Sequence, residues 1–226
     1  MKLSENTRLI LDNFTKINQS FYFEKGKKQK VTDRSKTCFA EVEFEEDISQ
    51  EFGIFKMDKF LSVLSLFKDP EIEFTETNAL TISGDNKKVS YISCEKELVF
   101  LAKASLMDMI KPEKISFKLT RDNLNEIQSA ASILQVQDLV IKGDGEKITL
   151  NVLDKSNDLN DSFTLEIGPT SEEFTYTLKT KELNLLSVDY TVKIHEIDTG
   201  KVTTEVIRFE CEPLKLSYFY PSMGDK

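Results

Sequence analysis

The acidic residues in the first quarter of the chain are the first group whose type and spacing could support chemistry. Five of them fall within seven positions: Glu41, Glu43, Glu45, Glu46 and Asp47. Clustered carboxylates of this kind can hold magnesium for phosphoryl transfer. However, the first three alternate with Val42 and Phe44, which is the period of a strand with one face in solvent. We therefore predict a solvated strand face here and not a metal site.

The remaining residues with chemical potential do not form a recognisable site either. His195 is the single histidine, which nearly excludes a catalytic triad or an imidazole metal site. Residues 154–161 have the spacing of a calcium loop, but Leu159 and Leu165 stand where glycine and glutamate are required. The sequence also lacks the nucleotide-binding and hydrolase motifs. We predict no catalytic residue, no metal and no cofactor, and hence a protein that is not an enzyme.

Composition limits the setting in which the protein works. Three widely spaced cysteines (Cys38, Cys94 and Cys211) without a nearby partner are typical of small buried apolar residues in a reducing compartment. No apolar run approaches the roughly 20 residues that cross a bilayer, so we expect a cytoplasmic protein that does not enter a membrane. The net charge of −9 argues against bulk attraction to nucleic acid, although the placement of charge matters more than its total.

Two pairs of segments repeat in the same order along the chain. Thr7-Arg8-x-x-Leu11 corresponds to Thr120-Arg121-x-x-Leu124, at an offset of 113 residues. Lys59-x-Leu61-x-x-Leu64 corresponds to Lys181-x-Leu183-x-x-Leu186, at an offset of 122. All four segments have apolar residues at helical spacing, and Ser4 and Thr120 are suitable N-caps. The pattern predicts two homologous halves with two helices in each.

The rest of the chain alternates apolar and polar residues, as strands do. Turn residues separate many of these runs, and the best hairpin signals are Gly143-Asp144-Gly145 and Gly84-Asp85-Asn86, with a third at Asp198-Thr199-Gly200. We predict an α+β protein dominated by antiparallel sheets. Its two similar domains are expected at 1–102 and 115–226, with a connector at 103–114.

The helical segments and the overall order then resemble a known family. MKLSENTRLILDNFTKINQS, FGIFKMDKFLSVLSLF and TRDNLNEIQSAASILQ are similar to segments of the sliding clamps of T4-type bacteriophages. The apolar and aromatic ending LKLSYFYP, followed by a short polar tail, is similar to sliding clamps generally. The shorter, less proline-rich connector is a departure from the family pattern. The resemblance implies the DNA-clamp fold, in which two inner helices per domain lie on antiparallel sheets and a homotrimer forms a pseudo-six-fold ring.

That ring would make the chain a processivity factor that encircles duplex DNA without reading its sequence. The helices lining the hole would then present basic residues to the phosphates, and the chain offers eight candidates: Lys2, Arg8, Lys16, Lys56, Lys59, Arg121, Lys179 and Lys181. Arg8 with Arg121, and Lys59 with Lys181, occupy equivalent positions of the repeat. Acidic residues share these helices. Weak phosphate contacts are enough, since ring closure retains the DNA and tight binding would slow sliding.

The resemblance also implies an apolar pocket for partner proteins beside the connector and the C-terminal strand. Its candidate residues are Leu106, Met107, Ile110, Tyr218, Tyr220 and Pro221. The expected partners are the DNA polymerase, the clamp-loader ATPase complex and a late-transcription coactivator, each docking a short apolar or aromatic peptide. Two alternatives stay open: a ring-forming adaptor that encloses no DNA, and a single-strand binder, which would need exposed aromatic residues among basic ones.

Overall fold

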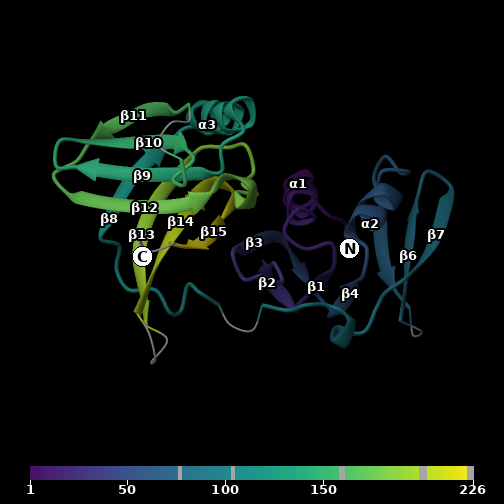
Figure 1. Cartoon of the computed structure of the whole chain (residues 1–226). Helices are drawn as coiled ribbons and strands as arrows, with labels where there is room; N and C mark the ends of the chain where they lie inside the picture. Colours follow the sequence, from purple (N-terminus) through teal and green to yellow (C-terminus); the bar gives the residue numbers. More distant parts are fainter. Residues whose placement is uncertain (76–77, 103–104, 158–160, 199–202, 223–226) are drawn as a thin grey trace. The chain divides into compact units, whose positions relative to one another are not determined.

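The computed structural model describes the chain from 1 to 226 except for residues 76–77, 103–104, 158–160, 199–202 and 223–226. The chain divides into two compact units (Figure 1). Unit 1 comprises residues 1–105 with 214–216, and unit 2 comprises 106–213 with 217–226. The division between residues 105 and 106 falls within the segment 103–114 that we predicted as a connector.

The two helices of unit 1 begin and end near the predicted segments. Helix α1 spans Glu5–Phe14, and the side chain of its N-cap Ser4 accepts a hydrogen bond from the Thr7 N–H. Helix α2 spans Met57–Leu64 and buries Met57, Phe60 and Leu64 on one face. The two helices pack side by side (Figure 1). Their apolar spacing therefore predicted both the helices and the buried face.

Unit 1 contains two strand pairs and one three-stranded sheet, all antiparallel. Strand β1 (Phe21–Phe23) pairs with β4 (Phe52–Ile54), and β2 (Gly26–Thr32) pairs with β3 (Phe39–Ile48). The third sheet has the order β5-β6-β7, from Glu71–Phe74, Ala79–Gly84 and Lys87–Ile92. Asp85 and Asn86 both have positive φ between β6 and β7, as the predicted tight hairpin requires. A short 3-10 turn, η1, follows at Lys96–Leu98.

Phenylalanine rings form a continuous core through unit 1. Phe14 on α1 contacts Phe21, with ring centroids 5.9 Å apart, and Phe23 stacks on Phe52 at 4.3 Å. Phe52 in turn meets Phe74 of β5 edge to face at 5.3 Å. Rings at these separations add to the stabilisation that comes from area burial alone. The core thus joins the first helix and β1 to β4 and β5, which are distant in sequence.

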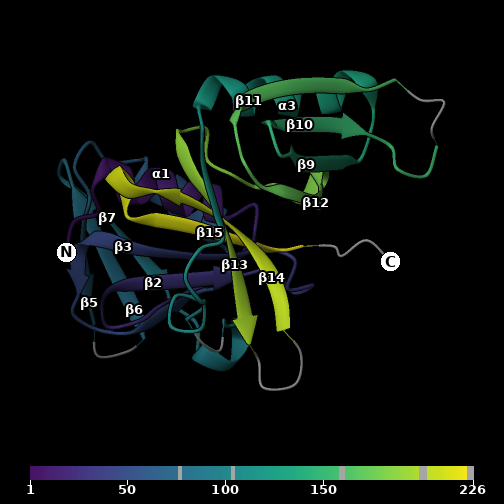
Figure 2. The same ribbon diagram turned by 90° about the vertical axis from the view of Figure 1, so that its left-hand side faces the viewer.

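Unit 2 places its one α-helix against a four-stranded sheet. Helix α3 spans Arg121–Leu134 and packs on β10 and β11 (Figure 2). The sheet order is β11-β10-β9-β12, from Phe163–Pro169, Lys147–Leu153, Asp138–Asp144 and Glu173–Lys179. Thr120 caps α3 by accepting from the Asn123 N–H. Gly145 has a φ of +85° in the β9–β10 turn, so the predicted hairpin and cap are both present.

A second sheet of unit 2 holds the C-terminal strand. Its order is β15-β14-β13-β8, from Leu216–Pro221, Thr203–Cys211, Tyr190–Asp198 and Ile115–Leu119. A last 3-10 turn, η3, lies at Glu212–Leu214. Tyr190 meets Phe209 and Tyr218 edge to face, at 6.0 and 6.2 Å between ring centroids. The third hairpin signal, at residues 198–200, lies largely outside the described residues.

The prediction of a second helix in unit 2 is wrong. Only a 3-10 turn, η2 (Thr180–Glu182), forms there, and the chain up to Asp189 is irregular. Leu183 and Leu185 are the buried residues, so burial follows a period of two. The Asn184 N–H donates to the Tyr220 hydroxyl at 3.1 Å, and the Leu186 carbonyl accepts from the Tyr190 hydroxyl at 2.7 Å. Backbone groups that a helix would pair internally are satisfied by two buried tyrosines instead.

The segment 180–189 nevertheless takes a place beside α3 that corresponds to that of α2 beside α1. Asp189 accepts a hydrogen bond from the Arg121 N–H at 2.7 Å, and the Ser187 hydroxyl donates to Asn125 at 2.8 Å. Both contacts join the irregular segment to the first two turns of α3. The repeat is therefore preserved in the order and position of its parts, although one part has lost its helical form.

Candidate nucleic-acid interface and partner-binding strap

The N-terminus of α1 is fixed by a carboxylate from a distant strand. Glu46 of β3 accepts hydrogen bonds from the Ser4 N–H and from the Thr7 hydroxyl. A carboxylate at this end of a helix satisfies otherwise unpaired N–H groups and complements the helix dipole. Glu46 thus sets where α1 begins and how its exposed face is oriented, including Arg8.

The candidate cations of unit 1 lie on or beside the two helices. Lys16, Lys56 and Lys59 are exposed and Arg8 is half-buried. The Lys59 ammonium lies 5.9 Å from the centre of the Tyr91 ring, and the Tyr91 hydroxyl donates to the Lys56 carbonyl at 3.2 Å. Lys2 is exposed but bonded to Asp69, which follows α2. This hydrogen bond is the main reason that the pKa of Lys2 is raised.

The candidate cations of unit 2 lie on α3 and around η2. Arg121 begins α3, and its guanidinium is 3.7 Å from the carboxylate of Asp122. Lys181 is exposed in η2. Unit 2 therefore brings Arg121 and Lys181 to two segments that lie side by side, as Arg8 and Lys59 lie on two packed helices of unit 1.

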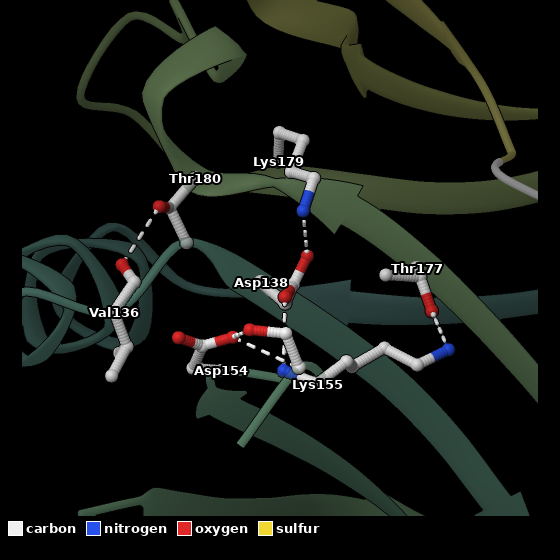
Figure 3. A network of polar contacts seen from close by, with 8 residues as sticks. Val136, Asp138, Asp154, Lys155, Thr177, Lys179 and Thr180 are labelled. Carbon is white, nitrogen blue, oxygen red and sulfur yellow. Dashed lines mark hydrogen bonds and ion pairs between the residues drawn. The ribbon is translucent and has the colours of Figure 1, made fainter. Parts of the chain in front are cut away.

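Lys179 differs from the other candidates because it is tied to a buried carboxylate. Its ammonium is 2.5 Å from Asp138, whose side chain is 5% exposed (Figure 3). Asp138 also accepts from the Lys155 N–H at 3.1 Å, and the Lys155 ammonium donates to the Thr177 hydroxyl at 3.3 Å. Thr180 adds a hydroxyl hydrogen bond to the Val136 carbonyl at 3.2 Å. The network fixes the chain after α3 against the end of β12.

Residues 106–114, here called the strap, run along the free edge of β13 inside unit 2. The Lys114 and Lys111 N–H groups donate to the Ile194 and Glu196 carbonyls, both at 2.9 Å. An isolated bridge then pairs Ile110 with Ile197. Ile115 of β8 pairs with Ile194 of β13. From that pair to the Ile110–Ile197 bridge, the chain advances five residues on the strap side and three residues along β13. The strap is therefore a bulged extension of β8, and Pro112, which has no N–H to donate, lies within the bulge.

His195 and three charged side chains hold the strap in place. The His195 Nδ1 is 2.8 Å from the Lys111 carbonyl, so Nδ1 must bear the proton. The Lys114 ammonium contacts Glu196 at 2.6 Å and Glu205 at 3.3 Å. These contacts raise the pKa of Lys114 and lower that of Glu196. The histidine that had no evident role in the sequence thus lies beneath the strap.

The structure separates the predicted pocket residues into exposed and buried groups. Met107 is 39% exposed, and Leu106 and Ile110 are half-buried. Pro221 is exposed, and the next residue, Ser222, donates its N–H to the Glu205 carbonyl at 2.9 Å. Tyr218 and Tyr220 are 0% and 2% exposed, so both are core residues that an incoming peptide does not reach. Alternation along β15 could not reveal this, because the whole strand from 216 to 220 is buried on both faces.

Burial of His195 predicts a measurable acid sensitivity. His195 is 3% exposed, and burial is the main cause of a pKa below the usual 6.5. The nearby Arg208 and Lys193 lower the pKa further, while the bond to Lys111 and the charge of Glu113 raise it. The unfolded state therefore binds a proton more readily, so stability is full above about pH 6.5 and declines as the pH falls below it.

We expect the denaturant concentration at the unfolding midpoint of unit 2 to decrease as the pH is lowered from about 6.5 to about 5, because the histidine of the unfolded chain becomes charged in this range. The single imidazole gives one ring signal by NMR, which reports its pKa directly. A His195→Asn variant should lose this part of the pH dependence while keeping the acid response of the carboxylates. A wild-type imidazole that titrates at or above 6.5 would contradict the prediction.

Two further searches bear on the site. Within the described ranges, no group of three or more His, Cys, Asp or Glu side chains is placed to hold a metal ion. No helix in this part of the chain is long and apolar enough to cross a membrane. Of the three cysteines, Cys38 and Cys211 are buried, whereas Cys94 is only half-buried. The prediction that all three are buried is thus wrong for Cys94.

Comparisons with known proteins agree with the fold. Residues 4–101 match the DNA polymerase processivity factor family. The chain is 25% identical over 209 residues to the sliding clamp of Vibrio phage KVP40, covering 86% of this chain and 90% of that one. It is 23% identical over 183 residues to the sliding clamp of Enterobacteria phage T4, covering 78% of each. A PCNA2–PCNA3 complex from Sulfolobus tokodaii matches with a TM-score of 0.67 at 12% identity, covering 97% and 96%.

Two units with helices on antiparallel sheets, together with this structural likeness, define the DNA-clamp fold. In sequence, the chain is similar to the sliding clamps of phages KVP40 and T4, and residues 4–101 match the DNA polymerase processivity factor model.

Proposed function

We propose that the protein encircles duplex DNA and tethers the replicative DNA polymerase for processive synthesis in the host cytoplasm, without catalysing a reaction itself. The observation that supports the proposal is the DNA-clamp fold in a chain that is similar in sequence to phage sliding clamps. Retention on DNA is the direct test. Protein loaded on circular duplex DNA should stay bound through gel filtration and should be released when the circle is cut. Equal loss from circular and linear DNA would refute encirclement.

Ring closure by three copies is the assembly that we propose, and two open sheet edges support it. Strand β5 is covered, because Ile72 and Met1 exchange backbone hydrogen bonds at 2.7 Å, so β7 is the open edge of its sheet. Strand β11 is an outer strand of the sheet in unit 2, and its residues are all exposed or half-buried. Open edges are normally protected. Pairing β7 of one copy with β11 of the next would cover both.

The composition of the two edges is complementary. Ile92 at the end of β7 is 81% exposed, and Ile133 on α3, which packs on β11, is 78% exposed. Strand β7 begins with Lys87 and Lys88, whereas β11 presents Glu166. The strands have six and seven residues, so one could pair along the other. A head-to-tail contact of this kind closes into a ring when the rotation allows it. Light scattering should give the mass of a trimer of the 25.9 kDa chain.

The surface facing the DNA in this proposal consists of α1 and α2 in unit 1, and of α3 with residues 180–189 in unit 2. Arg8, Lys59, Arg121 and Lys181 are the principal phosphate contacts, with Lys16 and Lys56 beside them. Asp12, Asp58, Asp122 and Glu126 share the same helices. The lining is therefore only weakly basic, which suits a ring that must slide.

The strap is the surface that we propose for partner peptides from the polymerase, the clamp loader and the late-transcription coactivator. Its docking residues are Leu106, Met107, Met109 and Ile110 with Pro221. Met109 is 37% exposed and lies two residues from Met107 in sequence. Methionine side chains adapt to several partners. Tyr218 and Tyr220 stay buried in the core of the sheet and do not contact the peptide.

Shortening both exposed methionines should weaken the polymerase interaction. We expect a Met107→Ala, Met109→Ala double variant to lower polymerase affinity by about tenfold or more, because apolar anchors supply much of such binding energy. The measurement is the concentration of clamp that gives half-maximal processive synthesis. Leu66→Ala, which shortens an exposed apolar residue in unit 1, is the matched control. Equal effects of the two variants would contradict the placement of the site.

A further inference from the structure

Some of the cations proposed to face the DNA form ion pairs with carboxylates of the same chain. Of the eight candidates, three have a carboxylate within 4 Å among the described residues: Lys2 with Asp69, Arg121 with Asp122, and Lys179 with Asp138. The Arg121 contact is between neighbours in sequence and its partners are 62% and 82% exposed, so it is loose. The two lysine pairs are close, and each unit contains one of them.

The pair in unit 2 is built so that the lysine stays with its carboxylate. Asp138 is buried and has fixed partners, namely the Lys155 N–H and the Lys179 ammonium (Figure 3). Separating Lys179 from Asp138 would leave a buried carboxylate without its counter-charge, which is costly. A phosphate that approaches Lys179 therefore competes with a partner 2.5 Å away, and most of the charge of this lysine is already balanced.

The pair in unit 1 has the same consequence in a more exposed setting. Lys2 precedes α1 and Asp69 follows α2, so their contact lies at one end of the two packed helices. The side chains are 53% and 69% exposed, where solvent screens an ion pair and its effect on stability is small. A contribution to stability alone therefore gives little reason for this pair.

We propose that Asp69 and Asp138 act as attenuating carboxylates, which hold Lys2 and Lys179 away from the DNA phosphates and keep the grip of the ring weak. The inference rests on the proposed function. It assigns these aspartates a role in setting the strength of DNA contact. Affinity for DNA backbones depends on salt through the number of phosphates that are neutralised. Each lysine that is held back removes one such contact from every copy in the ring.

The test compares binding of a short linear DNA duplex, which can thread the ring from its end, by fluorescence anisotropy over a range of salt concentrations. We expect Asp69→Asn and Asp138→Asn to bind more tightly at low salt. Each should steepen the slope of log affinity against log salt by about 0.9 for every lysine released onto a phosphate. A structural role for these aspartates would lower stability without steepening the slope.

Two controls separate local release from a general change of charge. Glu43→Gln removes the same charge from a different pair, between Glu43 of β3 and Lys215. Lys215 is not one of the candidates for the lining, so this variant should leave the slope unchanged. The double variant Asp138→Asn, Lys179→Gln should return to the wild-type slope, because the released cation is absent. If Asp138→Asn fails to fold, the exposed Asp69→Asn decides the question with its own double variant, Lys2→Gln.

Slopes for Asp69→Asn and Asp138→Asn no steeper than that of Glu43→Gln would overturn the inference. Retention of the wild type on circular DNA, measured with the same preparation, separates this outcome from failure of the proposed function. A wild type that is retained, with variants that leave the slope unchanged, contradicts only the attenuating role. A wild type that is not retained contradicts encirclement itself.

Discussion

Replacing Ile92 with aspartate will convert the proposed trimer into monomers and abolish retention on circular DNA. In the single chain this side chain is 81% exposed, so the substitution should leave the fold of unit 1 intact. In the proposed seam the same position is covered by β11 of the next copy. An unpaired carboxylate buried there costs several kcal/mol, and each ring contains three such seams.

The measurement is mass by light scattering together with retention on circular DNA after gel filtration. Leu98→Asp is the matched control, because Leu98 is 60% exposed and lies in η1, which packs on β4 and is not part of the proposed seam. It should remain trimeric and be retained. A trimeric Ile92→Asp protein would show that the seam lies elsewhere.

Removing the four cations that repeat between the units will sharply reduce contact with DNA while leaving the ring assembled. The variant changes Arg8, Lys59, Arg121 and Lys181 to alanine. Each phosphate contact that is lost should lower the salt-dependence slope by about 0.9, and four per copy would remove most of the electrostatic attraction. We expect poorer loading and shorter retention, with the largest loss of processive synthesis at raised salt.

A control with equal charge loss tests whether position matters. Lys25, Lys27, Lys28 and Lys36 are exposed in or beside β2, and their replacement with alanine removes the same four charges. This control should retain most of its activity. Unchanged processivity in the lining variant at raised salt would show that these residues do not face the DNA, and equal impairment in both variants would point to net charge alone.

Local signals were enough to predict much of the fold. Ser4 and Thr120 cap the helices that they were expected to cap, because a cap depends on residues only three positions away. The hairpins at Asp85-Asn86 and at Gly145 form for the same reason, since the chain there needs positive φ. Alternation located most of the strands. Strand β2 was missed because its lysines hide the period, although lysine is common on edge strands.

Contacts between distant residues decided what the sequence left open. The segment at 180–189 has helical spacing, yet Tyr190 and Tyr220 take its backbone hydrogen bonds. Lys179 has the sequence pattern of a DNA-facing lysine, yet Asp138, which lies 41 residues earlier, holds its ammonium. His195 seemed isolated and lies beneath the strap. None of these partners is within reach of a local pattern.

The sequence by itself predicted the α+β class with antiparallel sheets and the repeated order of segments, showed no recognisable catalytic motif, and resembled the sliding clamps. These depend on periodicity, turn chemistry and residue order, which are local properties of the chain. Only the tertiary structure decided which candidate cations remain unpaired and which pocket residues are accessible. Tyr218 and Tyr220, which we predicted in the pocket, lie in the core, because burial and ion pairing depend on residues that meet only when the strands assemble.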